Sequence, residues 1–169
     1  MELKDYNARE GGVVAAAGFK AAGLHAGFRK NPHRKDVALV VADELCPAAG
    51  VFTQNVFCAA PVVVSREHLG PQSFGLARAV IINSGNANAA TGALGIEAAQ
   101  AAAKITADGI GCAEEDVLVC STGVIGIQLP LEPYSNSMAE LVASAGSTVE
   151  DGTNAAQAIM TTDTVSKQY

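Results

Sequence analysis

Hydrophobic residues gather in short runs along this chain, and the composition of each run predicts where strands form. Three runs rich in Val, Ile, Leu and Ala predict buried strands over residues 36–42, 78–83 and 117–120. A shorter run predicts another strand over residues 49–53. Glycines spaced among apolar residues favour a pair of short strands joined by turns within residues 11–27.

Longer segments with apolar residues at helical spacing predict helices over residues 93–110, 131–145 and 149–160. Residues 60–69 fit a strand that runs into a short helix, and periodicity does not settle this segment. Because helices alternate with strands in the second half, the pattern is typical of an α/β fold. The sequence shows no linker or repeat, so we expect one domain over residues 1–169.

The composition of the chain argues against a protein that binds nucleic acid or spans a membrane. Hydrophobic residues make up 49% of the chain, but aromatics only 5% and Trp is absent, so the core must be built from closely packed aliphatic side chains. The net charge of −6 offers no positive surface for nucleic acid or an anionic membrane. The longest apolar runs are far shorter than the roughly 20 residues that span a bilayer. A small-molecule partner is therefore favoured, with no nucleic acid and no membrane.

The cysteines and the N-terminus bear on the cellular compartment. Cys46, Cys58, Cys112 and Cys120 are widely spaced and form neither a CxxC pair nor a zinc-ribbon pattern. We interpret them as small buried thiols of a reducing compartment, with no disulfide and no metal. Residues 1–6 lack the basic-then-apolar pattern of a signal peptide. The sequence thus predicts a cytoplasmic protein.

The three histidines of the chain do not form a self-contained acid–base site. His25, His33 and His68 stand in unrelated contexts, without a Ser, Cys or Asp in the order of a triad, and each fits a surface or hydrogen-bonded structural role. The loop over residues 29–35 is basic, which would suit an anionic substrate or simply a solvated turn.

Residues 84–92 form a Gly- and Asn-rich loop between a predicted strand and a predicted helix. Backbone amides at such a helix N-terminus can hold a carboxylate or an oxyanion. The loop has neither the Walker lysine nor the glycines of a dinucleotide motif. Since Asn and Gly are also the ordinary residues of tight turns, a binding loop and a structural turn both remain open.

Thr122 and Gly123 follow the predicted strand over residues 117–120. A hydroxyl and a glycine N–H on a rigid element are the donors that an oxyanion hole requires, about 3 Å from the developing charge. A plain strand-to-turn transition would use the same residue types.

Residues 161–164, Thr-Thr-Asp-Thr, follow an apolar run. Three hydroxyls and one carboxylate at this position could form a binding shelf or only the polar end of a helix. Spacing alone does not distinguish the two.

Taken together and in order, these motifs closely resemble the ornithine acetyltransferase family of arginine biosynthesis. The resemblance runs along nearly the whole chain. Its main segments are residues 82–89 (INSGNANA), 91–92 (TG), 121–126 (STGVIG) and 158–164 (AIMTTDT).

The resemblance implies a two-chain enzyme. Family members are made as one precursor that cuts itself before a threonine, which gives an α chain and a β chain whose new N-terminal Thr is the nucleophile. The present sequence resembles the α chain, so the cut and the nucleophile are expected beyond residue 169. The implied fold is a sandwich of two sheets between helix layers, shared with the β chain, in an assembly of two α and two β chains.

The resemblance also implies a reaction and its residues. Acetyl would pass from N-acetylornithine to glutamate through an acetyl-threonine, with Thr122 and Gly123 as the oxyanion hole and Thr161 as a substrate-binding residue. No metal, nucleotide or other cofactor is expected. Acetyl-CoA is a possible second acetyl donor, because some members also acetylate glutamate directly.

Two alternatives stay open from the sequence. Aminopeptidase-like hydrolases with an N-terminal nucleophile share the general architecture and the oxyanion chemistry. A non-enzymatic domain that binds a small ligand would fit the absence of a recognisable nucleophile in this chain.

Overall fold

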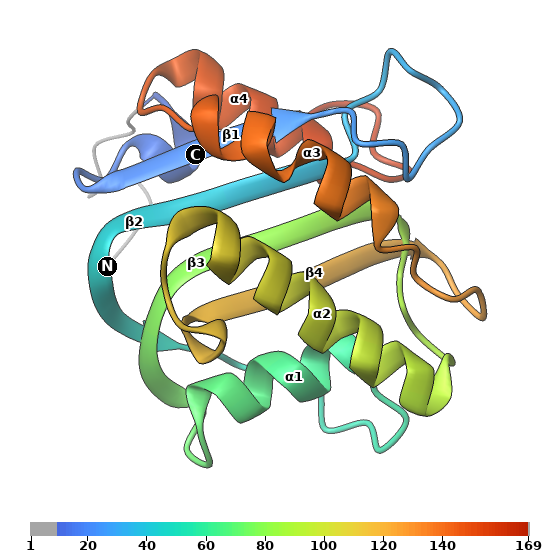
Figure 1. The fold of residues 1–169 in the computed structure, drawn as a ribbon. Helices are drawn as coiled ribbons and strands as arrows, with labels where there is room; N and C mark the ends of the chain where they lie inside the picture. Colours follow the sequence, from blue (N-terminus) through green and yellow to red (C-terminus); the bar gives the residue numbers. More distant parts are fainter. Residues whose placement is uncertain (1–9, 169) are drawn as a thin grey trace, which may run out of the picture.

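A single mixed sheet of four strands forms the centre of the computed structural model, which describes residues 10–168 (Figure 1). The strands are β1 (Phe19–Leu24), β2 (Val37–Ala49), β3 (Phe74–Asn86) and β4 (Val117–Val124), in that order across the sheet. Both β1–β2 and β2–β3 are antiparallel, whereas β3 and β4 are parallel. The parallel pair places the C-terminal ends of β3 and β4 side by side, which matters for the site.

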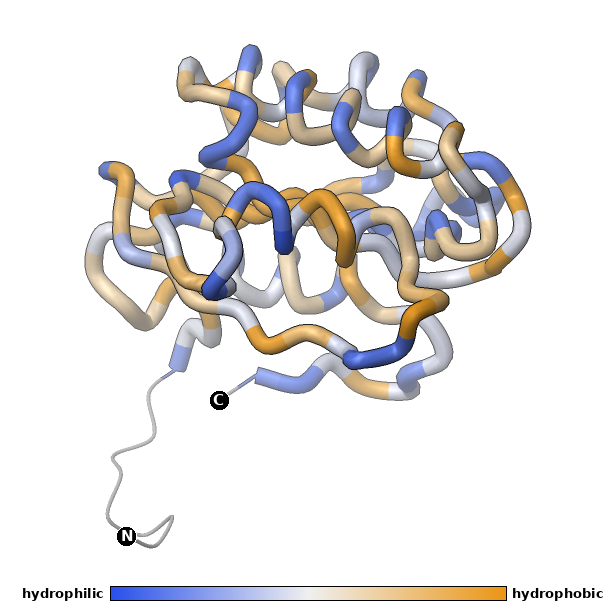
Figure 2. Tube along the Cα trace, turned by 90° about the horizontal axis from the view of Figure 1, so that it is seen from below, coloured by the Kyte–Doolittle hydropathy of each residue, from blue (hydrophilic) through white to orange (hydrophobic). Residues whose placement is uncertain are grey.

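Helices cover the two faces of the sheet unequally. They are α1 (Ala60–Leu69), α2 (Gly92–Ile110), α3 (Glu132–Ala143) and α4 (Val149–Ala158), with short 3-10 turns η2 (Gly12–Val14) and η3 (Glu114–Asp116). Helices α1, α2 and α3 pack on the face that carries Ala22 and Leu39. Helix α4 packs on the face of Ala21 and Ala38. Hydrophobic residues accordingly run through the central layer in Figure 2, and hydrophilic residues lie on many outer turns.

Helix α4 approaches β1 closely because the contact residues are small. A Cβ on Gly23 would collide with the backbone of Asn154 in α4. Ala21 in β1 and Ala155 in α4 are both buried in the same cluster. The aliphatic, Ala-rich core expected from the composition thus takes the form of close helix–sheet contacts.

Most predicted elements are confirmed, with longer strands than expected. The three main predicted strands became β2, β3 and β4, the three predicted helices became α2, α3 and α4, and residues 60–69 form the helix α1. The α/β class is therefore confirmed, with a mixed sheet. The separate strand over residues 49–53 is wrong, as is the pair of strands within residues 11–27, of which only β1 forms.

Both errors have a local physical cause. The first predicted strand stops before the polar residues Asp43 and Glu44, but β2 continues through them to Ala49, with a register shift against β3 between Val41 and Cys46. Such a bulge bends a strand without ending it. Near the N-terminus, Gly11 and Gly12 both have positive φ, and this conformation leads into η2 rather than into a strand.

The cysteine interpretation is wrong in one respect. All four thiols are free, but Cys46, Cys58 and Cys112 are only half-buried and Cys120 is exposed. Cys120 lies on β4, where its neighbour Val119 is in the core, so its side chain points to the opposite face of the sheet. Within residues 10–168, no helix is long and apolar enough to cross a membrane. The prediction about residues 1–6 lies outside the described residues.

Candidate active site

Backbones meet closely where β3 and β4 end. The parallel register aligns Ser84 with Thr122 and Gly85 with Gly123. Both glycines have positive φ, +117° at Gly85 and +140° at Gly123. A Cβ on Gly123 would collide with the backbone of Gly85 and Asn86. Glycine is therefore required at Gly123 for both backbone conformation and space.

The segment that follows α4 returns to these strand ends and closes a cleft of about 390 Å³. Its lining residues are Arg29, Gly85, Thr122, Gly123, Val124, Thr161 and Thr162. The three residues singled out from the sequence, Thr122, Gly123 and Thr161, thus line one cleft. They come from β4 and from the chain after α4, which are about 40 residues apart in sequence.

Thr122 and Gly123 lie within β4 rather than in a turn after it. The sequence placed the strand end at Cys120, but β4 extends to Val124. Thr122 is half-buried and Gly123 is exposed. A strand paired with β3 is a rigid support, so both residues are held in fixed positions at the cleft.

The three histidines lie outside the cleft lining. Nδ1 of His68 is 2.7 Å from the carbonyl oxygen of Val117, and Nδ1 of His25 is 2.9 Å from that of Arg34. His33 is exposed. These contacts support the structural interpretation for His25 and His68.

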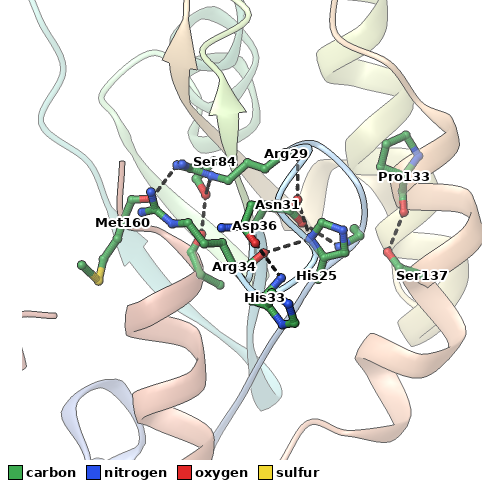
Figure 3. A network of polar contacts seen from close by, with 12 residues as sticks. His25, Arg29, Asn31, His33, Arg34, Asp36, Ser84, Pro133, Ser137 and Met160 are labelled. Atoms are coloured by element: carbon green, nitrogen blue, oxygen red, sulfur yellow. Dashed lines mark hydrogen bonds and ion pairs between the residues drawn. The ribbon is translucent and has the colours of Figure 1, made fainter. Parts of the chain in front are cut away.

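The basic loop before β2 turns back on the buried carboxylate of Asp36. The backbone N–H groups of Ala26 and Arg29 donate to its two oxygens, at 2.6 Å and 2.8 Å. Nδ1 of His25 lies 3.2 Å from the same carboxylate. Figure 3 shows Asp36 with His25 and Arg29 close to it. The loop is therefore anchored at its base and not merely a solvated turn.

Arg29 from this loop is the charged residue in the cleft lining. Its Nη2 donates to the carbonyl of Met160 at 2.6 Å, and its Nε donates to Oγ of Ser84 at 3.3 Å (Figure 3). Burial, and then the nearby charge of Arg34, lower the pKa of Arg29, while Asp36 acts in the opposite direction. Sequence reasoning did not single out Arg29, although the basic run was its visible signal.

Asparagines of the loop over residues 84–92 serve the fold itself. Nδ2 of Asn86 donates to the carbonyls of Ile127 and Gln128, both at 3.1 Å. Nδ2 of Asn88 donates to the carbonyl of Gly95, while its Oδ1 accepts from Thr91. These bonds tie the loop to α2 and to the chain after β4. They favour the structural turn over the binding loop.

Tyr134 is hydrogen-bonded to the C-terminal end of β3. It is buried in α3, and its hydroxyl donates to Oδ1 of Asn83 at 2.9 Å. Nδ2 of Asn83 in turn donates to the carbonyl of Asn86 at 2.8 Å. Burial is the main cause that raises the pKa of the Tyr134 hydroxyl, so it stays protonated as a donor. Its ring packs edge-on against Phe28, with centroids 4.8 Å apart.

Replacing Tyr134 with Phe should destabilise the chain without leaving a cavity in the core. The ring and its contact with Phe28 would remain, but Oδ1 of Asn83 would lose its buried donor. We expect the free energy of unfolding to fall by about 1–3 kcal/mol, the usual cost of such an unsatisfied group. Denaturant unfolding of the two proteins would measure it, and equal midpoints would show that the bond contributes little.

The chain is similar in sequence to proteins of one known family. The family model described as the ArgJ family matches residues 20–169. The chain is 47% identical over 158 residues to the chloroplastic arginine biosynthesis bifunctional protein ArgJ of Ostreococcus lucimarinus, with 94% of this chain and 34% of that protein covered. It is 44% identical to the ArgJ protein of Gloeobacter violaceus, with 98% of this chain and 39% of that protein covered.

Solved structures agree with the sequence relatives. An ArgJ crystal structure from Bacillus halodurans aligns with a TM-score of 0.84 and 37% identity, over 92% of this chain and 78% of that one. The ornithine acetyltransferase of Mycobacterium tuberculosis, solved in complex with ornithine, aligns with a TM-score of 0.86 and 40% identity, over 94% and 83% of the two chains. Against the curated relatives, by contrast, the chain spans little more than a third of their length.

Proposed function

The chain belongs to the ArgJ family, and from this premise we propose that it is the α subunit of an ornithine acetyltransferase. In this proposal the enzyme transfers acetyl from N-acetylornithine to glutamate in arginine biosynthesis. The observation that carries the proposal is the single cleft that Thr122, Gly123 and Thr161 line together. The ornithine in the complex from Mycobacterium tuberculosis supports a substrate of this chemical class.

The cleft suits acyl transfer through a tetrahedral intermediate. A nucleophile attacks the acetyl carbonyl, and the carbonyl oxygen then carries a negative charge that donors must stabilise. The hydroxyl of Thr122 and the backbone N–H of Gly123 are two such donors in our proposal. Because they stand on a paired strand, they need little rearrangement when the charge forms. The proposed nucleophile is the hydroxyl of the N-terminal threonine of a β chain. It forms an acetyl ester as the amide bond of N-acetylornithine breaks and ornithine leaves as the protonated amine. The amine of glutamate then attacks the ester, which releases N-acetylglutamate and restores the threonine hydroxyl.

One face of the sheet is only partly covered by a helix, and this supports a β chain as partner. Helix α4 covers β1 and β2 on this face. Farther along the same face, Ile82 and Leu118 are half-buried and Cys120 is exposed. An apolar hollow of about 300 Å³ beside α4 includes Val40, Ile82 and Ile159. A second sheet packed here would complete the proposed sandwich between helix layers, and we propose an assembly of two α and two β chains.

Cofactor and location are part of the same proposal. The exchange needs no metal and no nucleotide, since the acetyl group moves between two amino acids through the threonine. Acetyl-CoA would enter only as an alternative acetyl donor, in line with the word bifunctional in the names of the relatives. Cytoplasmic location stays a prediction, and the relative from Ostreococcus lucimarinus is chloroplastic.

One experiment separates this proposal from its alternatives. The complete enzyme is purified, every polypeptide in it is sequenced from its N-terminus, and acetyl transfer from N-acetylornithine to glutamate is assayed. A partner that begins with Thr, together with transfer, supports the acetyltransferase. Release of free amino acids from peptides without transfer would instead favour the aminopeptidase-like hydrolase. The absence of both activities would favour a domain that only binds a ligand.

Thr161→Val keeps the shape of the side chain and removes its hydroxyl. If that hydroxyl binds the amide or carboxylate of the acetylated amino acid, KM for N-acetylornithine should rise about 5- to 30-fold, while kcat changes less. The reason is that the same contact is present in the bound substrate and in the transition state. Steady-state kinetics of the complete enzyme measure both constants.

Thr164→Val is the matched control, because Thr164 is exposed and lies outside the cleft lining. Its KM should match that of the unmodified enzyme. An unchanged KM in Thr161→Val, combined with a lower melting temperature, would mean that Thr161 only supports the chain after α4.

A further inference from the structure

We propose that Arg29 is a positioning residue for this site: its guanidinium fastens the segment after α4 to the end of β3 and so sets the place of Thr161 in the cleft. The proposal rests on the function proposed above, because only in that function does Thr161 bind a substrate. It also makes a structural statement that can be tested without any activity.

The guanidinium of Arg29 connects two parts of the chain that are otherwise far apart in sequence. One of its donors, Nη2, reaches the carbonyl of Met160, the residue immediately before Thr161, at 2.6 Å. Its Nε reaches Oγ of Ser84 near the end of β3 at 3.3 Å. The same hydroxyl donates to the carbonyl of Ala158 at 2.6 Å. Ser84 and Arg29 therefore hold two carbonyls, one at the last residue of α4 and one in the segment that follows it.

A second arginine of the basic loop acts on the neighbouring residue. Nη2 of Arg34 donates to the carbonyl of Thr161 itself at 3.2 Å. Nζ of Lys35 contacts Oδ1 of Asn154 within α4. With Asp36 anchoring the base of the loop, three basic side chains contact α4 or the segment beyond it. Figure 3 shows Arg29 beside Met160. The positive charges of Arg29 and Arg34 also suit the C-terminal end of α4, where carbonyls lack helical partners.

A direct role in binding the substrate carboxylate fits the geometry less well. Arginine often grips a carboxylate with two parallel N–H groups of one edge. In Arg29, the edge formed by Nε and Nη2 already donates to Ser84 and to Met160. Among residues 10–168, no carboxylate forms an ion pair with the Arg29 guanidinium, and its hydrogen bonds go to two neutral oxygens, Oγ of Ser84 and the carbonyl of Met160.

The shape of the side chain matters as well as its charge. The stem of Arg29 passes over Gly85, where a Cβ would lie 3.1 Å from Cγ of Arg29. The planar guanidinium can then reach two acceptors in different directions at once. Lysine would keep the charge but has a single nitrogen at the end of a flexible stem, so it should hold Met160 or Ser84 but not both.

The test compares Arg29→Ala and Arg29→Lys with Arg66→Ala in the complete enzyme. Arg66 is a matched control, since its Nη2 also donates to a backbone carbonyl, that of Thr53 at 3.0 Å, away from the cleft. Hydrogen exchange of the amides in residues 160–164 gives the structural readout. We expect faster exchange there in Arg29→Ala, a smaller increase in Arg29→Lys, and no change in Arg66→Ala.

Kinetics give the second readout. We expect Arg29→Ala to raise KM for N-acetylornithine about 5- to 30-fold, as Thr161→Val does, with a smaller change in kcat. The double variant Arg29→Ala/Thr161→Val should have a KM close to that of either single variant, because both lose the same contact with Thr161.

Two outcomes would overturn the positioning role. Unchanged exchange of residues 160–164 in Arg29→Ala would show that the guanidinium does not hold the segment. Additive effects of the two substitutions on KM, with unchanged exchange, would mean that Arg29 binds the substrate directly. An unmodified enzyme without acetyl transfer would refute the proposed function alone, and the exchange measurement would still decide whether Arg29 holds the segment.

Discussion

Thr122→Ala is expected to lower kcat of the complete enzyme about 10²- to 10³-fold, with a smaller change in KM. Thr122 lies on β4 at the cleft, directly before Gly123. In our proposal its hydroxyl donates to the oxygen that becomes charged in the tetrahedral intermediate. Such a bond is strongest in the transition state, so its loss slows the reaction more than it weakens substrate binding. Steady-state kinetics with N-acetylornithine and glutamate provide the measurement.

Thr122→Ser is the matched control, because serine keeps a hydroxyl on the same Cβ. It should retain much more activity than the Ala variant. Hydrogen exchange or thermal melting should show that both variants fold as the unmodified protein does. A Thr122→Ala enzyme with unaltered kcat would remove this hydroxyl from the proposed oxyanion hole.

Gly123→Ala should damage both the fold and the reaction. The new Cβ would collide with the backbone of Gly85 and Asn86, and the φ of +140° is unfavourable for any residue with a Cβ. We expect the free energy of unfolding to fall by about 1–3 kcal/mol, the usual cost of one strained backbone position. We also expect kcat to fall at least about 10²-fold, because the strand end and its N–H donor would move.

Gly126→Ala is the matched control, because it separates the strain of a positive φ from the collision of a new Cβ with the backbone. Gly126 also has a positive φ, +76°, but a Cβ there would meet no atom within 4 Å. This variant should lose only modest stability and keep most of its kcat. Denaturant unfolding and steady-state kinetics on both variants give the comparison. Equal losses in the two would mean that the contact between β3 and β4 at Gly123 has no special importance.

Most of the correct predictions came from patterns among residues that are close together in sequence. Thr122 and Gly123 could be selected because a hydroxyl and a glycine after an apolar strand are visible locally. The bulge in β2 could not be predicted, because the apolar run ends before Asp43 and Glu44. The strand continues beyond them because residues 46–49 pair with β3. The pattern of apolar residues defines which face of an element is buried, but pairing across the sheet decides where it ends.

Arg29 illustrates what local reasoning misses. In the sequence it is one of several cations in a short polar loop, and nothing nearby distinguishes it from Lys30. Its contact with Met160 joins residues 131 positions apart, and only the finished fold brings them together. The composition of the loop fitted either an anionic substrate or a solvated turn, whereas the structure gives its arginines backbone carbonyls as partners.

The long-range contacts between the basic loop and the segment after α4 also bear on the order of folding. The antiparallel pairs β1–β2 and β2–β3 join neighbouring stretches of chain, but the bond from Arg29 to Met160 closes a loop of 131 residues. Closing a longer loop costs more chain entropy, so contacts of this kind tend to form after local ones. We therefore expect the sheet to form first and the cleft to assemble late, when α4 docks. A newly made chain would thus acquire its scaffold before it could bind anything at this site.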